Sequence, residues 1–354
     1  MRGRLRFGAV GVVLGLVAVG CGSGGGGTDG GGKAAGGGFP VTVTDCAGGR
    51  TTFSKAPEKI VTSNAASLEL LLRLGAGDQV IGTGFPPGKG TLPGALGARA
   101  DDVKVLSRSV IPKEKLLGSG AGLYVDTFGS MGGMGKGGGM GDVPTAEEYR
   151  AVGMKRVSLK STACAADRKS PVTDLSAVEG DITTLGAVTG NGDTAKELVT
   201  GMRKKVAAVQ KAVRGIPERK RPTYFFFDYD AGTKQPTVVC NRQVAHAVIT
   251  LAGARNVFGD CDGTFKQVGW EDVIAKNPDW IQLGVRNRGS AAANDKAFDE
   301  ARKWLESNPA TKGLDAVKRG HFLRIGSERT TIAGVTNADT VREIARTVHP
   351  GKVR

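Results

Sequence analysis

Short apolar runs alternate with helical stripes along most of the chain, and this alternation is the feature that most restricts its fold. Apolar strands are expected at 59–62, 79–82 and 123–125, and again at 224–227 and 280–283. Helices that lie between successive strands place the strands parallel and cover both faces of the sheet. The pattern predicts an α/β fold with mostly parallel central sheets.

One long helix is expected to interrupt this alternation. Apolar residues recur at helical spacing through 193–214, with Asp193 as an N-cap and Gly215 and Pro217 as the stop. Such a helix would be about 33 Å long. The sequence therefore predicts two Rossmann-like lobes with central, mostly parallel sheets, joined by one long interlobe helix. The expected boundaries are 40–190 for the N-terminal lobe, 191–215 for the helix and 216–354 for the C-terminal lobe.

The first residues have the pattern of a targeting segment. Three arginines precede an uncharged run over 7–20, which is too short to span a membrane of about 30 Å. Small residues then lead to Cys21, an arrangement that resembles the bacterial lipobox. We expect a lipoprotein signal peptide over 1–20, lipidation of Cys21 and a flexible Gly-rich tether over 21–39. An ordinary signal peptide with an incidental cysteine is the alternative.

Composition excludes several classes of protein. Hydrophobic residues make up 40% and charged residues 23% of the chain, which is a normal globular balance. The formal net charge of +15 is strongly basic, but aromatic residues are only 5% and no nucleic-acid recognition motif is present. We therefore expect no nucleic-acid partner, and interpret the charge as favouring an anionic envelope or anionic ligands.

Apart from Cys21, the cysteines are even in number, and an extracytoplasmic location favours disulfides. We expect the pairs Cys46–Cys164 and Cys240–Cys261, because each pair would then lie within one lobe. A metal site is the alternative, but the spacing lacks Cys-x-x-Cys and the histidines lie far apart in the sequence. No resident metal or cofactor is expected.

The motifs of common enzyme classes are missing from the sequence. It contains no Gly-x-Ser-x-Gly, no His-Glu-x-x-His and no P-loop pattern. We therefore expect a binding protein and not an enzyme.

Six short phrases of the sequence occur together in a recognisable order, at 56–61, 68–75, 181–186, 252–258, 269–273 and 277–281. Together they resemble the class III periplasmic binding proteins, which serve ABC importers of iron–siderophore complexes, haem and cobalamin. The resemblance covers about residues 41–350 and implies an extracytoplasmic, lipid-anchored and monomeric protein that delivers its ligand to a permease with its ATPase. It implies a ferric siderophore or similar metal chelate as ligand, with cobalamin or haem as alternatives, and a membrane-tethered sensor as the alternative to transport.

The resemblance also implies two permease-docking residues. In the family, one glutamate on the outer surface of each lobe meets arginines of the permease, and Glu114 and Glu271 match these positions. Both are also expected at helix N-termini, where the helix dipole alone favours an acidic residue.

The ligand is expected beyond the carboxyl ends of the parallel strands. Aromatic and cationic side chains in the loops there suit a bulky chelate with apolar parts and oxygen-rich groups. The Gly/Met tract at 131–141 is expected at the rim, as a ligand flap, a copper site or a low-complexity insertion. The candidate ligand-binding residues are Asn64, Phe85, Phe128, Tyr229, Arg242, Arg286 and Arg329.

Overall fold

A computed structural model describes residues 38–129 and 143–353. The predicted signal peptide, Cys21, all of the tether before Gly38 and the Gly/Met tract lie outside these residues. The strands of the structure are β1 (Val41–Thr44), β2 (Arg50–Phe53), β3 (Ile60–Thr62), β4 (Val80–Thr83), β5 (Leu123–Asp126), β6 (Lys155–Ser158), β7 (Thr223–Asp228), β8 (Thr237–Val239), β9 (Arg255–Asn256), β10 (Phe265–Gln267), β11 (Trp280–Gly284) and β12 (Phe322–Leu323).

The helices include all those expected from the sequence. They are α1 (Ala65–Arg73), α2 (Gly94–Asp101), α3 (Lys113–Leu117), α4 (Ala146–Ala151), α5 (Lys160–Ala163), α6 (Ser176–Thr189), α7 (Gly192–Val213), α8 (Val244–Leu251), α9 (Trp270–Lys276), α10 (Ala291–Ser307), α11 (Asp315–Arg319), α12 (Ser327–Thr331) and α13 (Asn337–Val348). Within the described residues, no helix is both long and apolar enough to cross a bilayer.

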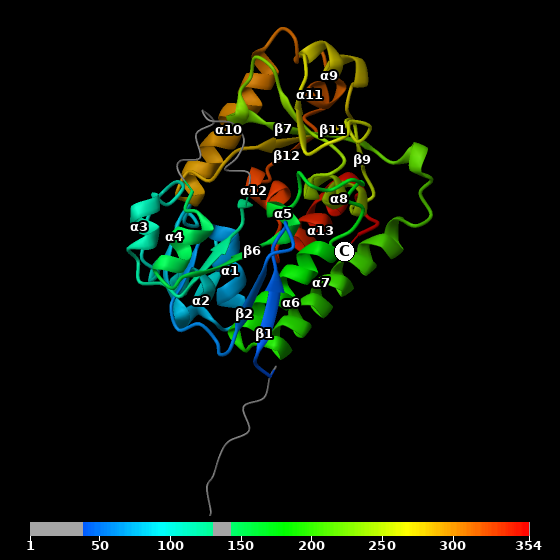
Figure 1. Cartoon of the computed structure of the whole chain (residues 1–354). Coiled ribbons are helices and arrows are strands. Elements are labelled where there is room, and N and C mark those ends of the chain that lie inside the picture. Colours follow the sequence, from blue (N-terminus) through cyan, green and yellow to red (C-terminus); the bar gives the residue numbers. More distant parts are fainter. Residues whose placement is uncertain (1–37, 130–142, 354) are drawn as a thin grey trace, which may run out of the picture. The chain divides into compact units, whose positions relative to one another are not determined.

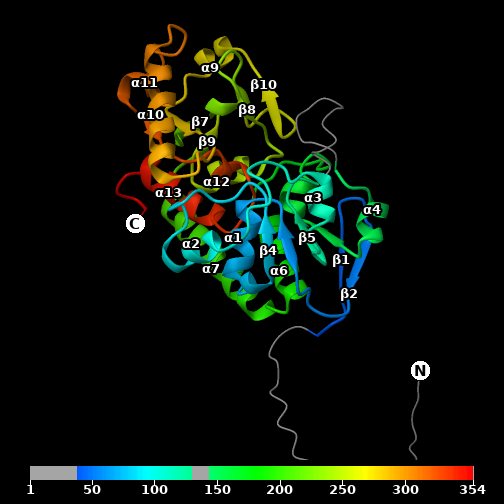
Figure 2. The ribbon, with the colours of Figure 1, turned by 90° about the vertical axis from the view of Figure 1, so that its left-hand side faces the viewer.

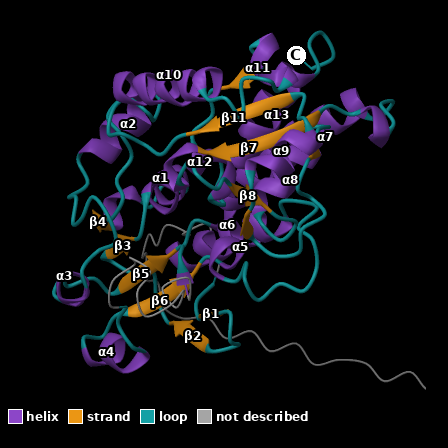
Figure 3. Cartoon of the chain, turned by 90° about the horizontal axis from the view of Figure 1, so that it is seen from above, coloured by secondary structure: helices purple, strands orange, loops and turns teal. Residues whose placement is uncertain are grey.

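Two four-stranded parallel sheets form the framework, as the alternation predicted. The order β4-β3-β5-β6 defines the N-terminal lobe (Figure 3), and β12-β11-β7-β9 defines the C-terminal lobe. The central strands are mostly apolar and buried because helices cover both faces. All four residues of β5 are buried, for example, and so are the last five of β7.

Two antiparallel pairs accompany the parallel sheets. The antiparallel hairpin β1–β2 lies beside the N-terminal sheet, and β8 pairs with β10 in the C-terminal lobe (Figure 2). The second pair was not predicted, because β8 and β10 are only three residues long and a helix lies between them in sequence.

The long helix α7 has 22 residues and packs along α6 and α13 (Figure 1). It begins one residue earlier than expected. Asn191 is its N-cap residue and makes no side-chain capping bond, so the assignment of Asp193 as the N-cap was wrong. The largest hydrophobic cluster runs without a break through α1, α6, α7, α8 and α13. This continuous core supports the proposal that 191–215 connects the lobes as a stiff element.

Close approach of α6 and α7 depends on Gly186. A Cβ atom there would lie 2.4 Å from the Cβ of Ala195, whereas a Cβ at Gly201, in the middle of α7, would meet nothing within 4 Å. We expect Gly186→Ala to destabilise the protein by about 1–3 kcal/mol through overpacking. Gly201→Ala is the matched control and should stabilise it by about 0.5–1 kcal/mol. Denaturant unfolding measures both, and a stabilising Gly186→Ala would contradict the helix contact.

Candidate ligand-binding site

Phe85 and Phe128 come together at the carboxyl ends of β4 and β5. Their ring centroids are 5.7 Å apart, with an angle of 66° between the rings, and both side chains are half-buried. Asp126 holds the second ring's backbone in place, because its Oδ1 accepts the N–H groups of Phe128 and Gly129, each at 3.0 Å. The N-terminal lobe thus presents an edge-to-face aromatic pair at the strand ends. The sequence placed both residues after strands but did not predict that they pair, and their contact with ligand stays a prediction.

Asn64 has a supporting place in the structure. It is buried and caps α1, where its Oδ1 accepts the N–H of Ser67 at 3.0 Å and the hydroxyl of Thr127 at 3.2 Å. These bonds tie the loop after β3 to the loop after β5. The side-chain oxygen of Asn64 already accepts two hydrogen bonds, so we assign Asn64 a supporting role in holding the loop that leads to Phe128.

The C-terminal lobe contributes charged residues at the ends of β7 and β11. Arg286 is 58% exposed at its side chain and lies 4.0 Å from the carboxylate of Asp228. Burial raises the pKa of Asp228, and the Arg286 guanidinium opposes this shift. The Oδ1 atom of Asp228 is buried without a hydrogen-bond partner among the described residues. Arg286 is therefore the candidate arginine with the loosest protein contact.

Two further acids build the loop that carries Arg286. Asp230 accepts the N–H of Arg286 at 2.6 Å and the guanidinium of Arg288, and Glu328 accepts the N–H of Asn287 at 2.9 Å. These roles of Asp230 and Glu328 were not predicted from the sequence. Their position immediately after predicted strands was the only signal, and it does not reveal which loop they hold.

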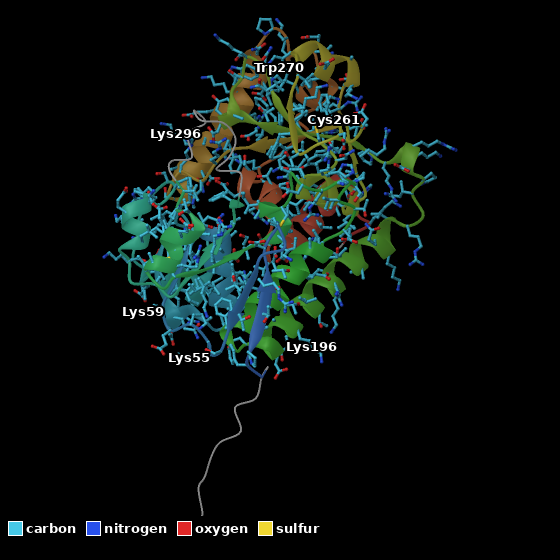
Figure 4. All side chains as sticks on the ribbon, in the orientation of Figure 1. Lys55, Lys59, Lys196, Cys261, Trp270 and Lys296 are labelled. Atoms are coloured by element: carbon cyan, nitrogen blue, oxygen red, sulfur yellow. A yellow bond between two sulfur atoms is a disulfide. The ribbon has the colours of Figure 1, made fainter. Side chains whose placement is uncertain are left out.

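Tyr229 lies at the same end of β7 and is half-buried. Its ring packs edge-to-face on Phe227 at 5.9 Å, and Phe227 in turn contacts Trp270 and Trp304. The candidate residue therefore joins an aromatic cluster that reaches the interior of the lobe, where Trp270 lies (Figure 4).

Arg242 and Arg329 have protein partners. One Arg242 nitrogen donates to the carbonyl of Arg168, and another lies 2.5 Å from the carboxylate of Asp262. Arg329 pairs with Glu343 of α13 at 2.7 Å. The structure does not group these two arginines with Phe85, Phe128 and Arg286, and their contact with ligand stays a prediction.

The family follows from sequence comparison. A family model described as "Periplasmic binding protein" matches residues 139–328. The chain belongs to this family. The resemblance to the class III members, drawn from short phrases in the sequence, is confirmed at this level.

Relatives of this periplasmic binding protein match most of its length. A cobalamin-binding protein of Halobacterium salinarum is 25% identical over 287 residues, which cover 80% of this chain and 69% of the relative. An uncharacterized ABC transporter substrate-binding lipoprotein of Bacillus subtilis, YvrC, is 23% identical over 358 residues, with 99% and 98% covered.

Solved structures share the fold. A periplasmic binding protein from Veillonella parvula is 28% identical, with a TM-score of 0.72 over 88% of this chain and 98% of the other. The structure titled as an ABC-type Fe3+-hydroxamate transport system from Saccharomonospora viridis gives 24% identity and a TM-score of 0.69, with 88% and 99% covered. At that identity the second likeness supports the fold alone.

The two candidate docking glutamates lie on separate lobes of this periplasmic binding protein. Glu114 is in the first turn of α3 and Glu271 in the first turn of α9, two helices that Figure 1 labels. Both side chains are exposed. The residues before these helices, Pro112 and Gly269, make no side-chain capping bond. The placement is compatible with docking and with a helix-dipole role alike.

Histidine and acidic side chains of the binding protein do not gather into a metal centre within the described ranges. His246 contacts Asn256, His321 contacts the carbonyl of Asp279, and His349 contacts that of Gly253. Burial lowers the pKa of His246, which is held inside the C-terminal lobe. Each ring thus has a local structural partner.

Both predicted disulfides are present. Cys46 is joined to Cys164 and Cys240 to Cys261. The first ties the hairpin β1–β2 to the segment that follows α5. The second ties the loop after β8 to the segment that leads into β10.

Proposed function

We propose that this protein is the extracytoplasmic substrate-binding component of an ABC importer and that it delivers a ferric siderophore. Family membership supports the binding role, and the relative YvrC is named a substrate-binding lipoprotein of an ABC transporter. The observation that carries the ligand class is the pairing of Phe85 with Phe128 on one lobe and a loosely held Arg286 on the other. We further propose that Cys21 carries the lipid anchor.

The combination of the aromatic pair with the Arg286 guanidinium suits a metal chelate. Aromatic edges and faces contact the apolar backbone of a bulky ligand, and an exposed guanidinium donates to chelate oxygens. Asp228 limits the charge that the ligand can carry, since its carboxylate lies beside the same guanidinium. A ligand that is neutral or weakly charged overall therefore fits better than a strongly anionic one.

Titration calorimetry with a panel of ferric trihydroxamate, ferric triscatecholate, haem and cobalamin tests the proposal. We expect the ferric trihydroxamate to bind most tightly. Arg286→Ala should weaken binding about tenfold to a hundredfold, because hydrogen bonds to charged groups contribute about 1.5–3 kcal/mol. Arg203→Ala is the matched control, since this arginine is exposed on α7 and pairs with Glu179. The proposal is wrong if no chelate binds or if both variants behave alike.

Cobalamin is the second candidate ligand. The relative from Halobacterium salinarum, named a cobalamin-binding protein, is similar over 80% of this chain. Tight binding of cobalamin together with weak binding of every ferric chelate would favour cobalamin as the ligand. The proposed binding site would be the same.

A further inference from the structure

The two lobes touch directly through the loops that follow β4 and β11. Lys89 of the first loop donates its backbone N–H to the carbonyl of Gly289 at 2.8 Å, and Lys89 pairs with Ser290 in an isolated parallel bridge. The Asn287 side-chain amide is 3.5 Å from the carbonyl of Pro86. We call this contact, between residues 86–89 and 287–290, the latch.

Gly88 makes the latch close-fitting. It is buried between the loops, and a Cβ at this position would lie 2.4 Å from the Asn287 Oδ1 and 3.0 Å from the carbonyl carbon of Gly289. Any side chain at Gly88 would push the loops apart. The loop on the C-terminal lobe cannot easily yield, because Asp230 and Glu328 hold its backbone from within that lobe.

A second contact between the lobes lies near the disulfides. Val172 donates its N–H to the carbonyl of Asn241 at 2.8 Å, and the guanidinium of Arg242 donates to the carbonyl of Arg168. We call this contact, between residues 168–172 and 241–242, the seam. Cys164 lies just before one side of the seam, and Cys240 directly precedes the other.

The latch and the seam lie at opposite edges of the N-terminal sheet. The latch follows β4, which is one edge strand, and 168–172 follow β6, which is the other. Phe128 follows β5, an inner strand, and so lies between the two contacts in the strand order, which Figure 3 shows. Phe85 directly precedes the latch, and Arg242 is part of the seam.

The two contacts differ in strength for identifiable reasons. The latch consists of the Lys89–Gly289 backbone hydrogen bond, the Lys89–Ser290 bridge and one marginal side-chain contact, all of them between neutral groups. Lys89 and Gly289 are exposed. A neutral hydrogen bond of this kind contributes about 0.5–1.5 kcal/mol. The seam includes a charge-assisted bond from Arg242, which is roughly twice as strong, and Val172 is buried there. Two disulfides also brace the segments on either side of the seam.

We propose that the lobes separate at the latch and stay joined at the seam, so that a ligand enters between the lobes on the latch side. On opening, the contacts of the latch break, while the contacts of the seam and the continuous hydrophobic core along α7 stay intact. The role as a ligand entrance rests on the proposed binding function, whereas the asymmetry of opening is a property of the protein alone.

Spin-label distance measurements on the ligand-free protein test this asymmetry. One label pair, at Thr91 and Lys296, spans the latch side, and Figure 4 marks Lys296 on α10. The other pair, at Lys169 and Lys266, spans the seam side, and all four positions are exposed. Labels attached through a bio-orthogonal amino acid leave the disulfides intact. We expect a second, longer distance for the latch pair and a single narrow distance for the seam pair.

Gly88→Ala sharpens the test. Overpacking of about 1–3 kcal/mol in the closed latch should raise the ratio of open to closed latch about tenfold, with the seam distance unchanged. Gly180→Ala in α6 is the control, because a Cβ there would meet nothing within 4 Å. Broadening of the seam pair, equal broadening of both pairs, or no response to Gly88→Ala would overturn the inference. Because no ligand is added, failure to bind a chelate cannot produce any of these outcomes.

Discussion

Replacing both Cys46 and Cys164 by alanine should lower the free energy of unfolding by about 5 kcal/mol. The two residues are 118 positions apart, so their disulfide removes a large amount of chain entropy from the unfolded state. The bond also fixes the hairpin β1–β2, which is an isolated two-stranded pair and is only marginally stable by itself. Guanidinium unfolding, followed by circular dichroism, measures the change.

The second disulfide provides the matched control. Cys240 and Cys261 are 21 positions apart, and the same entropy argument gives a loss of about 3 kcal/mol for the double alanine variant. We expect the difference between the two variants to be about 1.5 kcal/mol. A larger loss for the shorter loop would show that packing around Cys240 and Cys261, which lie within the C-terminal lobe, outweighs chain entropy (Figure 4).

The order of strands and helices could be predicted because it depends on short stretches of neighbouring residues. Parallel strands that are buried on both faces appear in the sequence as short runs of mostly apolar residues, such as Leu123–Asp126. Helices appear as apolar residues that recur every three or four positions. The disulfide pairing was predicted on the assumption that each bridge lies within one lobe. The sequence also placed Phe85 and Phe128 at strand ends, where parallel topology brings them together.

Pairing between distant segments could not be predicted in the same way. The contact between Arg242 and Arg168, which is 74 residues earlier in the sequence, was not predicted, and contact of Arg242 with the ligand stays a prediction. The latch depends on a glycine that fits against a loop some 200 residues away, and no local pattern reveals that Gly88 needs this space. The helices and strands could therefore be predicted from the sequence, but the long-range partners of single residues could be identified only in the structure.

Reversing the charge of both candidate docking residues, with Glu114→Lys and Glu271→Lys, should abolish ligand uptake by cells while ligand affinity stays unchanged. Two fixed carboxylates on separate lobes can orient the protein over a permease through charge complementarity. Reversal replaces attraction by repulsion on both lobes at once. Uptake of the radiolabelled chelate that binds the purified protein most tightly, compared with its calorimetric affinity, measures the two effects separately.

The helix-dipole interpretation of these residues predicts a different result. Placing lysine in the first turn of α3 and α9 would then cost only about 0.3–1 kcal/mol of stability at each site and leave uptake normal. Glu197→Lys combined with Glu300→Lys is the control for overall charge, because both residues are exposed on other helices, α7 and α10. Loss of uptake in this control would mean that uptake depends on the net charge of the protein and not on the positions of Glu114 and Glu271. Docking by both lobes together is supported if uptake is lost only in the variant with both Glu114→Lys and Glu271→Lys. Each single reversal should then give uptake between that of this variant and that of the unmodified protein.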